Sequence, residues 1–180
     1  MAIVLNVGGG AARASPPGYE GWTHHVLDID PDVQPDVCCD ALLMREKLDA
    51  SSYDAVYCSH NLEHFYQHDV PIVLAGFMHV LRKDGTAEIH VPNLSFLMEQ
   101  VVDGKRDVND VWYQSGGGPV TFHDVLYGWS KAMRAGNLFY AHKCGFTPAS
   151  LKAALVSAGF SRVKIEAQES NLMARAKKCS

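Results

Sequence analysis

A glycine turn and a distant carboxylate are the residues of this chain whose types and spacing point most directly to chemistry. An apolar run over residues 3–7 leads directly into Gly8, Gly9 and Gly10, and a second apolar run ends at Asp28. Glycines lack the Cβ atoms that keep a ligand away from the backbone. A carboxylate at the end of the next strand can accept hydrogen bonds from both ribose hydroxyls. The pattern predicts a nucleoside-binding site at the carboxyl edge of a parallel sheet.

The residues after this turn argue against a dinucleotide. The dinucleotide fingerprint has glycine at its first, third and sixth positions, and the sixth position here is Arg13. Pro16 and Pro17 lack backbone donors and clash with a preceding helical turn, so no long helix can begin here. The helix N-terminus that holds a pyrophosphate is therefore expected to be missing or short. A nucleoside without phosphates, such as S-adenosylmethionine (SAM), fits better, and a turn without any ligand is the alternative.

Composition limits the class of protein. The chain has 180 residues, of which 47% are hydrophobic and 20% are charged, which is typical of one α/β domain with a sizeable core. The net charge is −4 without a Lys/Arg stripe, so nucleic-acid binding is not favoured. No apolar run approaches the ~20 residues of a membrane span. The early first strand leaves no room for a signal peptide, and five cysteines without a CxxC pair indicate reduced thiols, so we expect a cytoplasmic protein.

Short apolar runs alternate with helical patterns, as in βαβ units of a parallel sheet. The expected strands are residues 3–7, 25–29, 36–40, 53–58, 86–91, 162–168 and 172–178. The expected helices are residues 70–81, with Asp69 as N-cap and Pro71 in the first turn, 94–102, one near 121–135, and 148–159. The short connection at 169–171 makes the last two strands antiparallel. Residues 93–146 are too few for a core of their own, so we expect a single domain, residues 1–180, with an acceptor-side insertion at 93–146.

Six motifs follow one another in a recognisable order. They are Leu5-Asn6-Val7-Gly8-Gly9-Gly10, Gly21-Trp22 with Leu27-Asp28-Ile29-Asp30-Pro31, Cys39-Asp40-Ala41, Ser59-His60-Asn61-Leu62-Glu63-His64-Phe65, Val80-Leu81-Arg82-Lys83-Asp84-Gly85 and Gly145-Phe146-Thr147-Pro148. Together they resemble the class I SAM-dependent methyltransferases, and most closely the small bacterial enzymes of the methyltransferase type 11 kind. The resemblance implies a Rossmann-like, mostly parallel seven-stranded sheet of order 3-2-1-4-5-7-6, with strand 7 antiparallel and helices on both faces. Asn6 and Ala12 depart from the family, which has an acidic residue and a third glycine there.

The resemblance also implies a set of cofactor-binding residues, namely Asn6, Gly8, Gly10, Asp28, Ile29, Asp40, Ala41 and Cys58. In it Asp28 binds the ribose hydroxyls, Ile29 packs on the adenine face, and Asp40 meets the adenine amino group. Two of these carboxylates have a structural alternative: Asp28 can cap a turn, and Asp40 can cap a helix.

Three histidines are candidate catalytic residues: His60, His123 and His142. Methyl transfer from a positively charged sulfur depends mostly on alignment, and a base is needed only when the acceptor must lose a proton. Histidine titrates near neutrality and can take that proton. The resemblance places His60 beside the point of methyl transfer, whereas His123 and His142 fall in the insertion that should form the acceptor pocket. Each of the three can also be a structural histidine.

A metal site is not predicted. His60, His64 and His68 lie four residues apart with Glu63 among them. The zinc motif HExxH requires a glutamate directly after its first histidine, and Asn61 stands there instead.

These observations favour a SAM-dependent methyltransferase that acts on a small molecule or, as the resemblance implies, a glycan precursor, at an oxygen atom. An N-methyltransferase and a non-catalytic binding or scaffold module with the same fold are the alternatives. An NAD-linked oxidoreductase is disfavoured by Arg13.

Overall fold

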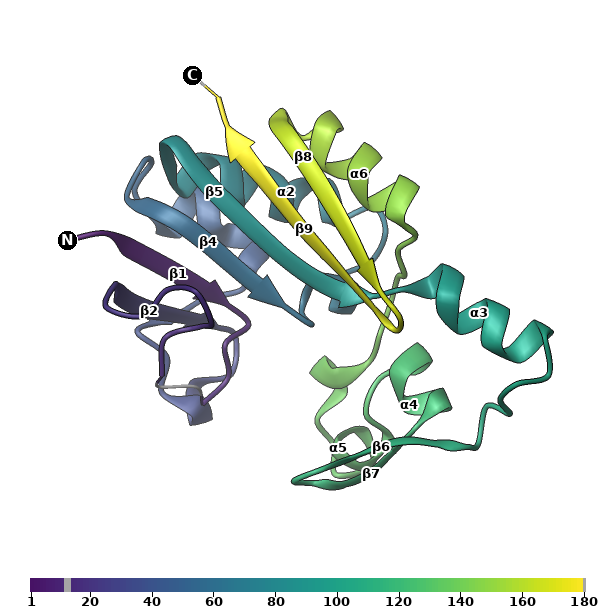
Figure 1. The fold of residues 1–180 in the computed structure, drawn as a ribbon. Helices are drawn as coiled ribbons and strands as arrows, with labels where there is room; N and C mark the ends of the chain where they lie inside the picture. The colour runs from purple at the N-terminus through teal and green to yellow at the C-terminus, as the bar shows by residue number, and fades with distance from the viewer. Residues whose placement is uncertain (12–13, 180) are drawn as a thin grey trace.

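A seven-stranded sheet forms the centre of the computed structural model, which describes residues 1–11 and 14–179 (Figure 1). Its order is β3-β2-β1-β4-β5-β9-β8. The strands are β1 (Ile3–Val7), β2 (Thr23–Asp28), β3 (Val37–Cys38), β4 (Tyr53–Ser59), β5 (Leu81–Pro92), β8 (Phe160–Gln168) and β9 (Asn171–Lys178). β9 pairs antiparallel with β5 and β8. The remaining neighbours in the sheet, β3-β2, β2-β1, β1-β4 and β4-β5, are parallel pairs. The predicted order and the antiparallel strand are confirmed, although β3 is shorter than the expected 36–40.

The burial of each strand explains its place in the sheet. Val4, Leu5 and Val7 of β1 are fully buried, as expected of a central parallel strand that is covered on both faces. In β9, buried residues such as Leu172 alternate with partly or fully exposed residues such as Arg175. This alternation is expected of an antiparallel strand with one face exposed to solvent. The hydrophobic pattern therefore distinguishes the central parallel strand from the antiparallel end of the sheet.

Three helices pack together on one face of the sheet: α1 (Met44–Lys47), α2 (Val70–Val80) and α6 (Pro148–Ser157). α2 begins with Pro71 in its first turn as predicted, but the Asp69 side chain makes no cap hydrogen bond. On the opposite face, near β1 and β4, Tyr19 and Trp22 cover the sheet in the described structure, where we expected helices. In Figure 1, α2 lies behind the strands and α6 is seen beside β8. None of the helices described here is long and apolar enough to cross a membrane.

The segment between β1 and β2 contains turns and no helix in its described residues, 8–11 and 14–22, as the prolines predict. Ala12 and Arg13, on which part of the sequence argument depends, lie outside the described residues. The described part of this segment therefore lacks the helix that follows the first strand in dinucleotide-binding folds.

Residues 93–146 lie beyond the carboxyl ends of β4 and β5 (Figure 1). They contain α3 (Leu94–Val102), the hairpin β6 (Val111–Ser115) and β7 (Gly118–Thr121), α4 (Phe122–Tyr127) and α5 (Ser130–Arg134). The prediction of one helix near 121–135 is wrong, because Gly128 breaks it with a φ of 100° where its backbone meets that of Tyr140. The hairpin was not predicted. These elements place aromatic and histidine side chains opposite the end of the sheet.

A single carboxylate joins the two helices of this segment. Asp124 accepts hydrogen bonds from Thr121 in a capping box at the start of α4 and from the backbone N–H of Ser130, the first residue of α5. Burial raises the pKa of this carboxyl group, but hydrogen bonds from Ser130 and Thr121 outweigh burial and lower the pKa to about 2. The charged form of Asp124 therefore stabilises the folded segment.

We expect Asp124→Ala to lower the free energy of unfolding at pH 7 by about 2 kcal/mol. Because the folded pKa lies below the unfolded value, this stabilisation is complete above the unfolded pKa and is lost as the pH falls toward 2. Urea unfolding should therefore show about half the difference at pH 3. Asp103→Ala is the control, since the Asp103 side chain pairs with the exposed Lys105 and its loss should change the stability little. If the loss of unfolding free energy in Asp124→Ala stays constant between pH 7 and pH 3, the lowered pKa of Asp124 does not stabilise the fold.

Candidate functional site

A cavity of about 200 Å³ opens at the carboxyl ends of β1, β2 and β4, and we call it the sheet-edge cavity. Five of the predicted cofactor-binding residues line it: Gly8, Asp28, Ile29, Asp40 and Ala41. Gly10 lines a shallower hollow beside it, which shares Gly8 and Asp28 with the cavity. The structure thus brings together residues from three separate motifs of the sequence.

The Asp28 side chain links the glycine turn to the end of β2 through hydrogen bonds. Its Oδ2 accepts a hydrogen bond from the backbone N–H of Gly10 at 2.8 Å, and its Oδ1 accepts one from the N–H of Asp30 at 3.0 Å. Each carboxylate oxygen has two acceptor positions and accepts one hydrogen bond from the described residues, so each has a second position for a donor in the cavity. Asp28 therefore has the turn-capping role that the sequence left open, and it also faces the cavity.

The backbone at Gly8 requires glycine. Its φ is +72°, its N–H donates to the carbonyl of Leu27 at 2.8 Å, and a Cβ atom here would lie 2.7 Å from the Cβ of Asn61. Only a residue without a side chain permits this close approach of the turn and the loop after β4. Asn61 in turn lines the sheet-edge cavity.

Two other predicted cofactor-binding residues do not line the cavities found in the described chain. Asn6 is 6% exposed and lies beneath the turn, where a Cβ atom on Gly9 would meet its side-chain amide. Cys58 is fully buried in the core that faces the helices, and burial raises the pKa of its thiol to about 12. Both residues support the site from within the fold.

Asp40 has the helix-capping role that was its alternative. Its side chain accepts a hydrogen bond from the backbone N–H of Leu42 at 2.9 Å and caps the short 3-10 helix Ala41–Leu43. The same carboxylate and the buried Ala41 line the sheet-edge cavity, as does the exposed Ile29. The cap therefore positions Asp40 at the cavity wall.

Sequence reasoning missed part of the cavity wall. Phe65 and Tyr66 come from the loop after β4, and Phe139 and Lys143 come from the far end of the 93–146 segment. The Lys143 ammonium lies 5.2 Å from the centre of the Tyr66 ring. The aromatic residues were visible in the sequence, but no spacing rule connects residue 65 with residue 139.

A second cavity, of about 460 Å³, lies between the loop after β4 and the 93–146 segment, and we call it the outer cavity. Trp112, Trp129 and Tyr140 contribute aromatic side chains to its lining. His64 lines both this cavity and the sheet-edge cavity. The two cavities therefore adjoin at His64.

The structure brings two of the three predicted catalytic histidines into the outer cavity. His60 has a φ of 49°, and its Nδ1 lies 3.4 Å from Glu63 Oε1, which raises the pKa of His60 against the opposing effect of burial. His142 lines the same cavity, and burial lowers its pKa. His123 lies instead on the exposed side of α4 against Tyr127, and it lines none of the cavities of the described chain.

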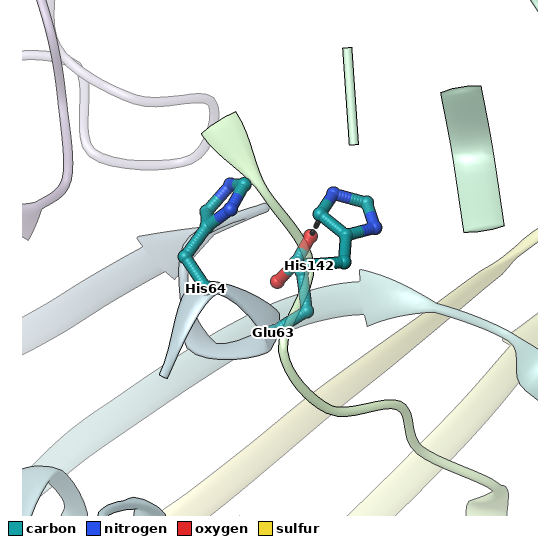
Figure 2. Close-up of side chains that lie close together, drawn as sticks. All are labelled: Glu63, His64 and His142. Atoms are coloured by element: carbon teal, nitrogen blue, oxygen red, sulfur yellow. Dashed lines mark ion pairs between the residues drawn. The ribbon is translucent and has the colours of Figure 1, made fainter. Parts of the chain in front are cut away.

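Glu63, His64 and His142 form a compact cluster at the wall of the outer cavity (Figure 2). One donor atom from each of the three lies within 4.8 Å of the others. Glu63 is 1% exposed, and neither of its carboxylate oxygens has a hydrogen-bond partner among the described residues. His68, which the sequence places on the same spacing as His60 and His64, has a side chain that is 79% exposed and lies outside the cluster.

Comparison with solved structures identifies the fold. No protein-family model and no curated protein sequence matches the chain. A SAM-dependent methyltransferase from Archaeoglobus fulgidus has a TM-score of 0.62 at 18% identity, over 98% of this chain and 86% of that one. The 1,6-didemethyltoxoflavin-N1-methyltransferase of Burkholderia thailandensis, solved with S-adenosylhomocysteine, has a TM-score of 0.62 at 19% identity. That match covers 99% of this chain and 72% of the other one. The chain has the fold of the SAM-dependent methyltransferases.

A third similar structure shows how the chain differs in length from some proteins of this fold. Human N-acetylserotonin methyltransferase, solved in complex with SAM, has a TM-score of 0.60 at 17% identity. The match covers 99% of this chain but 48% of the human protein, so the chain spans about half of that length. At these identities the likeness establishes the fold, and function has to be argued from the site.

Proposed function

We propose that the protein transfers a methyl group from SAM to a hydroxyl group of a small molecule or a glycan precursor. The observation that carries the proposal is the pair of cavities that adjoin at His64, one bordered by Asp28 and the glycine turn and the other by aromatic rings and histidines. When bound, SAM supplies a methyl carbon that a positively charged sulfur has activated. Similar structures that contain SAM or S-adenosylhomocysteine support this assignment of the cofactor.

The sheet-edge cavity fits the adenosyl part of such a cofactor. The free acceptor positions of Asp28 suit two ribose hydroxyls, and Ile29 offers an apolar surface for the adenine ring. Asp40 and Ala41 line the same cavity, where the Asp40 carboxylate offers an acceptor and the Ala41 backbone offers a donor for the ring edge. The described part of the segment after β1 has no helix N-terminus for a phosphate, which favours a phosphate-free ligand.

The outer cavity fits an acceptor with a ring. Trp112, Trp129 and Tyr140 can stack on a sugar or an aromatic ring, and they keep water from the acceptor. His60 borders the same space, with its Nδ1 3.4 Å from Glu63 Oε1, and its imidazole can take the proton that a hydroxyl group must lose. An amine acceptor that is already neutral needs no such base, which distinguishes O-methylation from N-methylation.

Two successive measurements test the proposal: first the binding of S-adenosylhomocysteine, and then the transfer of a radioactive methyl group from SAM. Because a ligand that binds only the folded state raises its melting temperature, we expect a rise with S-adenosylhomocysteine and none with NAD. Label from radioactive SAM should then appear in a small molecule of a cell extract. A rise with NAD alone would overturn the proposal, and no rise with either ligand would favour a scaffold module.

We expect His60→Asn to lower kcat by about 100-fold while the affinity for S-adenosylhomocysteine stays within twofold, because the base acts on the acceptor and not on the cofactor. Asparagine is the replacement of choice because it tolerates the left-handed backbone at this position. Steady-state kinetics and calorimetry provide the two values. His68→Ala, at an exposed side chain outside both cavities, is the control. Unaltered turnover in His60→Asn would make His60 a packing residue.

A further inference from the structure

We propose that Glu63, His64 and His142 bind a divalent first-row transition-metal ion. Their donor atoms lie within 4.8 Å of one another, and Glu63 Oε1 is 4.0 Å from His142 Nε2. That separation is about twice the length of a metal–ligand bond, which is ~2.0–2.2 Å for nitrogen and oxygen donors. A tetrahedral ion holds two such ligand atoms ~3.4 Å apart, so the two side chains need to approach each other by about 0.6 Å to share it.

The buried carboxylate of Glu63 is an independent sign of a cation. A carboxylate that is taken out of water is strongly unfavourable unless a positive charge or hydrogen bonds replace the lost hydration. Glu63 is 1% exposed, yet both of its oxygens lack a hydrogen-bond partner in the described structure. In Figure 2 the carboxylate points toward the histidine rings and not into the core. A bound cation would supply the missing partner.

The geometry of the two histidines leaves the Nε2 atom of each ring free to bind a metal ion. His64 Nδ1 lies 3.1 Å from the carbonyl oxygen of Ala141, and a carbonyl can only accept, so Nδ1 carries the proton. His64 Nε2 is then unprotonated and has a lone pair for a metal. A backbone carbonyl in this position is the usual outer partner of a metal-binding histidine. The backbone N–H of His142 donates to the carbonyl of Tyr127 at 3.0 Å, and the Nε2 of its ring faces Glu63.

This donor set indicates the class of ion. Two neutral imidazoles and one carboxylate suit Zn²⁺ and its neighbours Mn²⁺, Fe²⁺ and Co²⁺, and they do not suit Ca²⁺, which takes oxygen ligands. All three side chains line the outer cavity, so the remaining coordination positions face a space of about 460 Å³. Such an open site can accept water or an oxygen atom of a ligand in that cavity.

The alternative is an ion pair without a metal. His60 Nδ1 lies 3.4 Å from Glu63 Oε1, and a protonated His60 would neutralise the carboxylate. The sequence could not show the metal site, because His142 belongs to the 93–146 segment and has no fixed spacing to Glu63 and His64. Direct measurement of metal binding separates the two cases.

Calorimetric titration of the chelator-treated full chain with Zn²⁺ tests the proposal, and Co²⁺ absorption reports the ligands. We expect one ion per chain. We expect Glu63→Gln and His142→Ala to weaken binding by ~100-fold or more, since loss of even an outer partner of a ligand costs ~10–100-fold. His123→Ala removes a histidine of the same segment that lies outside the cluster, and it should leave the affinity unchanged.

Folding of the variants is measured in parallel. Glu63→Gln keeps the shape of the side chain and removes the buried charge, so in chelator its melting temperature should equal or exceed that of the wild type. Zn²⁺ should raise the melting temperature of the wild type but not of Glu63→Gln. Absence of stoichiometric binding, or equal weakening by His123→Ala, would overturn the proposal. The site does not depend on methyl transfer, and a titration of the metal-free chain with S-adenosylhomocysteine tests that function separately.

Discussion

Asp28→Ala is expected to weaken the binding of S-adenosylhomocysteine by about 10- to 100-fold, or roughly 1.5–3 kcal/mol, as calorimetry can measure. The variant loses the charged acceptor for the ribose hydroxyls. It also releases the N–H groups of Gly10 and Asp30, which the carboxylate holds at 2.8 and 3.0 Å. Both effects act on the same cavity wall, so the loss of affinity should be among the largest for any single side chain of this site.

A matched control separates the role of Asp28 in the cavity from its role in holding the chain. Asp36 also accepts a hydrogen bond from a backbone N–H of β2, that of Val26 at 2.8 Å, but it does not line the sheet-edge cavity. Asp36→Ala should lower the free energy of unfolding without a comparable loss of affinity. Unchanged affinity in Asp28→Ala, or an equal loss in Asp36→Ala, would remove Asp28 from the site.

The sheet was predictable because its signals are local. The continuous burial of β1 and the short connection between β8 and β9 are visible in a few residues each, and they determine the centre and the antiparallel end of the sheet. The described residues between β1 and β2 form no helix, as Pro16 and Pro17 predict, because the effect of proline on the backbone needs no tertiary contact.

The 93–146 segment was harder to predict because its elements depend on contacts between distant residues. A helical pattern runs through residues 121–135, but the approach of the Tyr140 backbone to Gly128 divides it. In the described structure β6 and β7 form a two-stranded sheet separate from the main sheet, so the turn of the hairpin is its local signal in the sequence. Propensity over one window cannot show such a constraint.

Side-chain direction explains most of the difference between the predicted and the observed site. Asp28 and Asp40 were assigned from their place at the ends of strands, and both line the cavity. Cys58 lies at the end of β4 as expected, but its side chain points toward the helical layer and not toward the cavity. Successive strand residues point to opposite faces, so an error of one position reverses an assignment.

Gly8→Ala is expected to lower the free energy of unfolding by about 2–3 kcal/mol, of which roughly 1–2 kcal/mol comes from the left-handed backbone alone. The rest comes from overlap, because the new Cβ would lie 2.7 Å from the Cβ of Asn61. Relief of that overlap moves Asn61 away from the turn and alters the sheet-edge cavity that both residues line. The affinity for S-adenosylhomocysteine should therefore fall by more than about 10-fold, because Gly8 and Asn61 contact each other and the effects of neighbouring residues are coupled.

Gly18→Ala measures the backbone contribution by itself. Gly18 has a φ of +84°, and a Cβ atom there would meet no other atom within 4 Å, so only the conformational strain of about 1–2 kcal/mol applies. Urea unfolding and titration with S-adenosylhomocysteine of both variants give the comparison. Adding Asn61→Ala to Gly8→Ala should restore part of the stability, because it removes the atoms of Asn61 nearest to the new methyl group. If Gly8→Ala and Gly18→Ala lose the same stability and both keep full affinity, Gly8 does not hold the cavity wall.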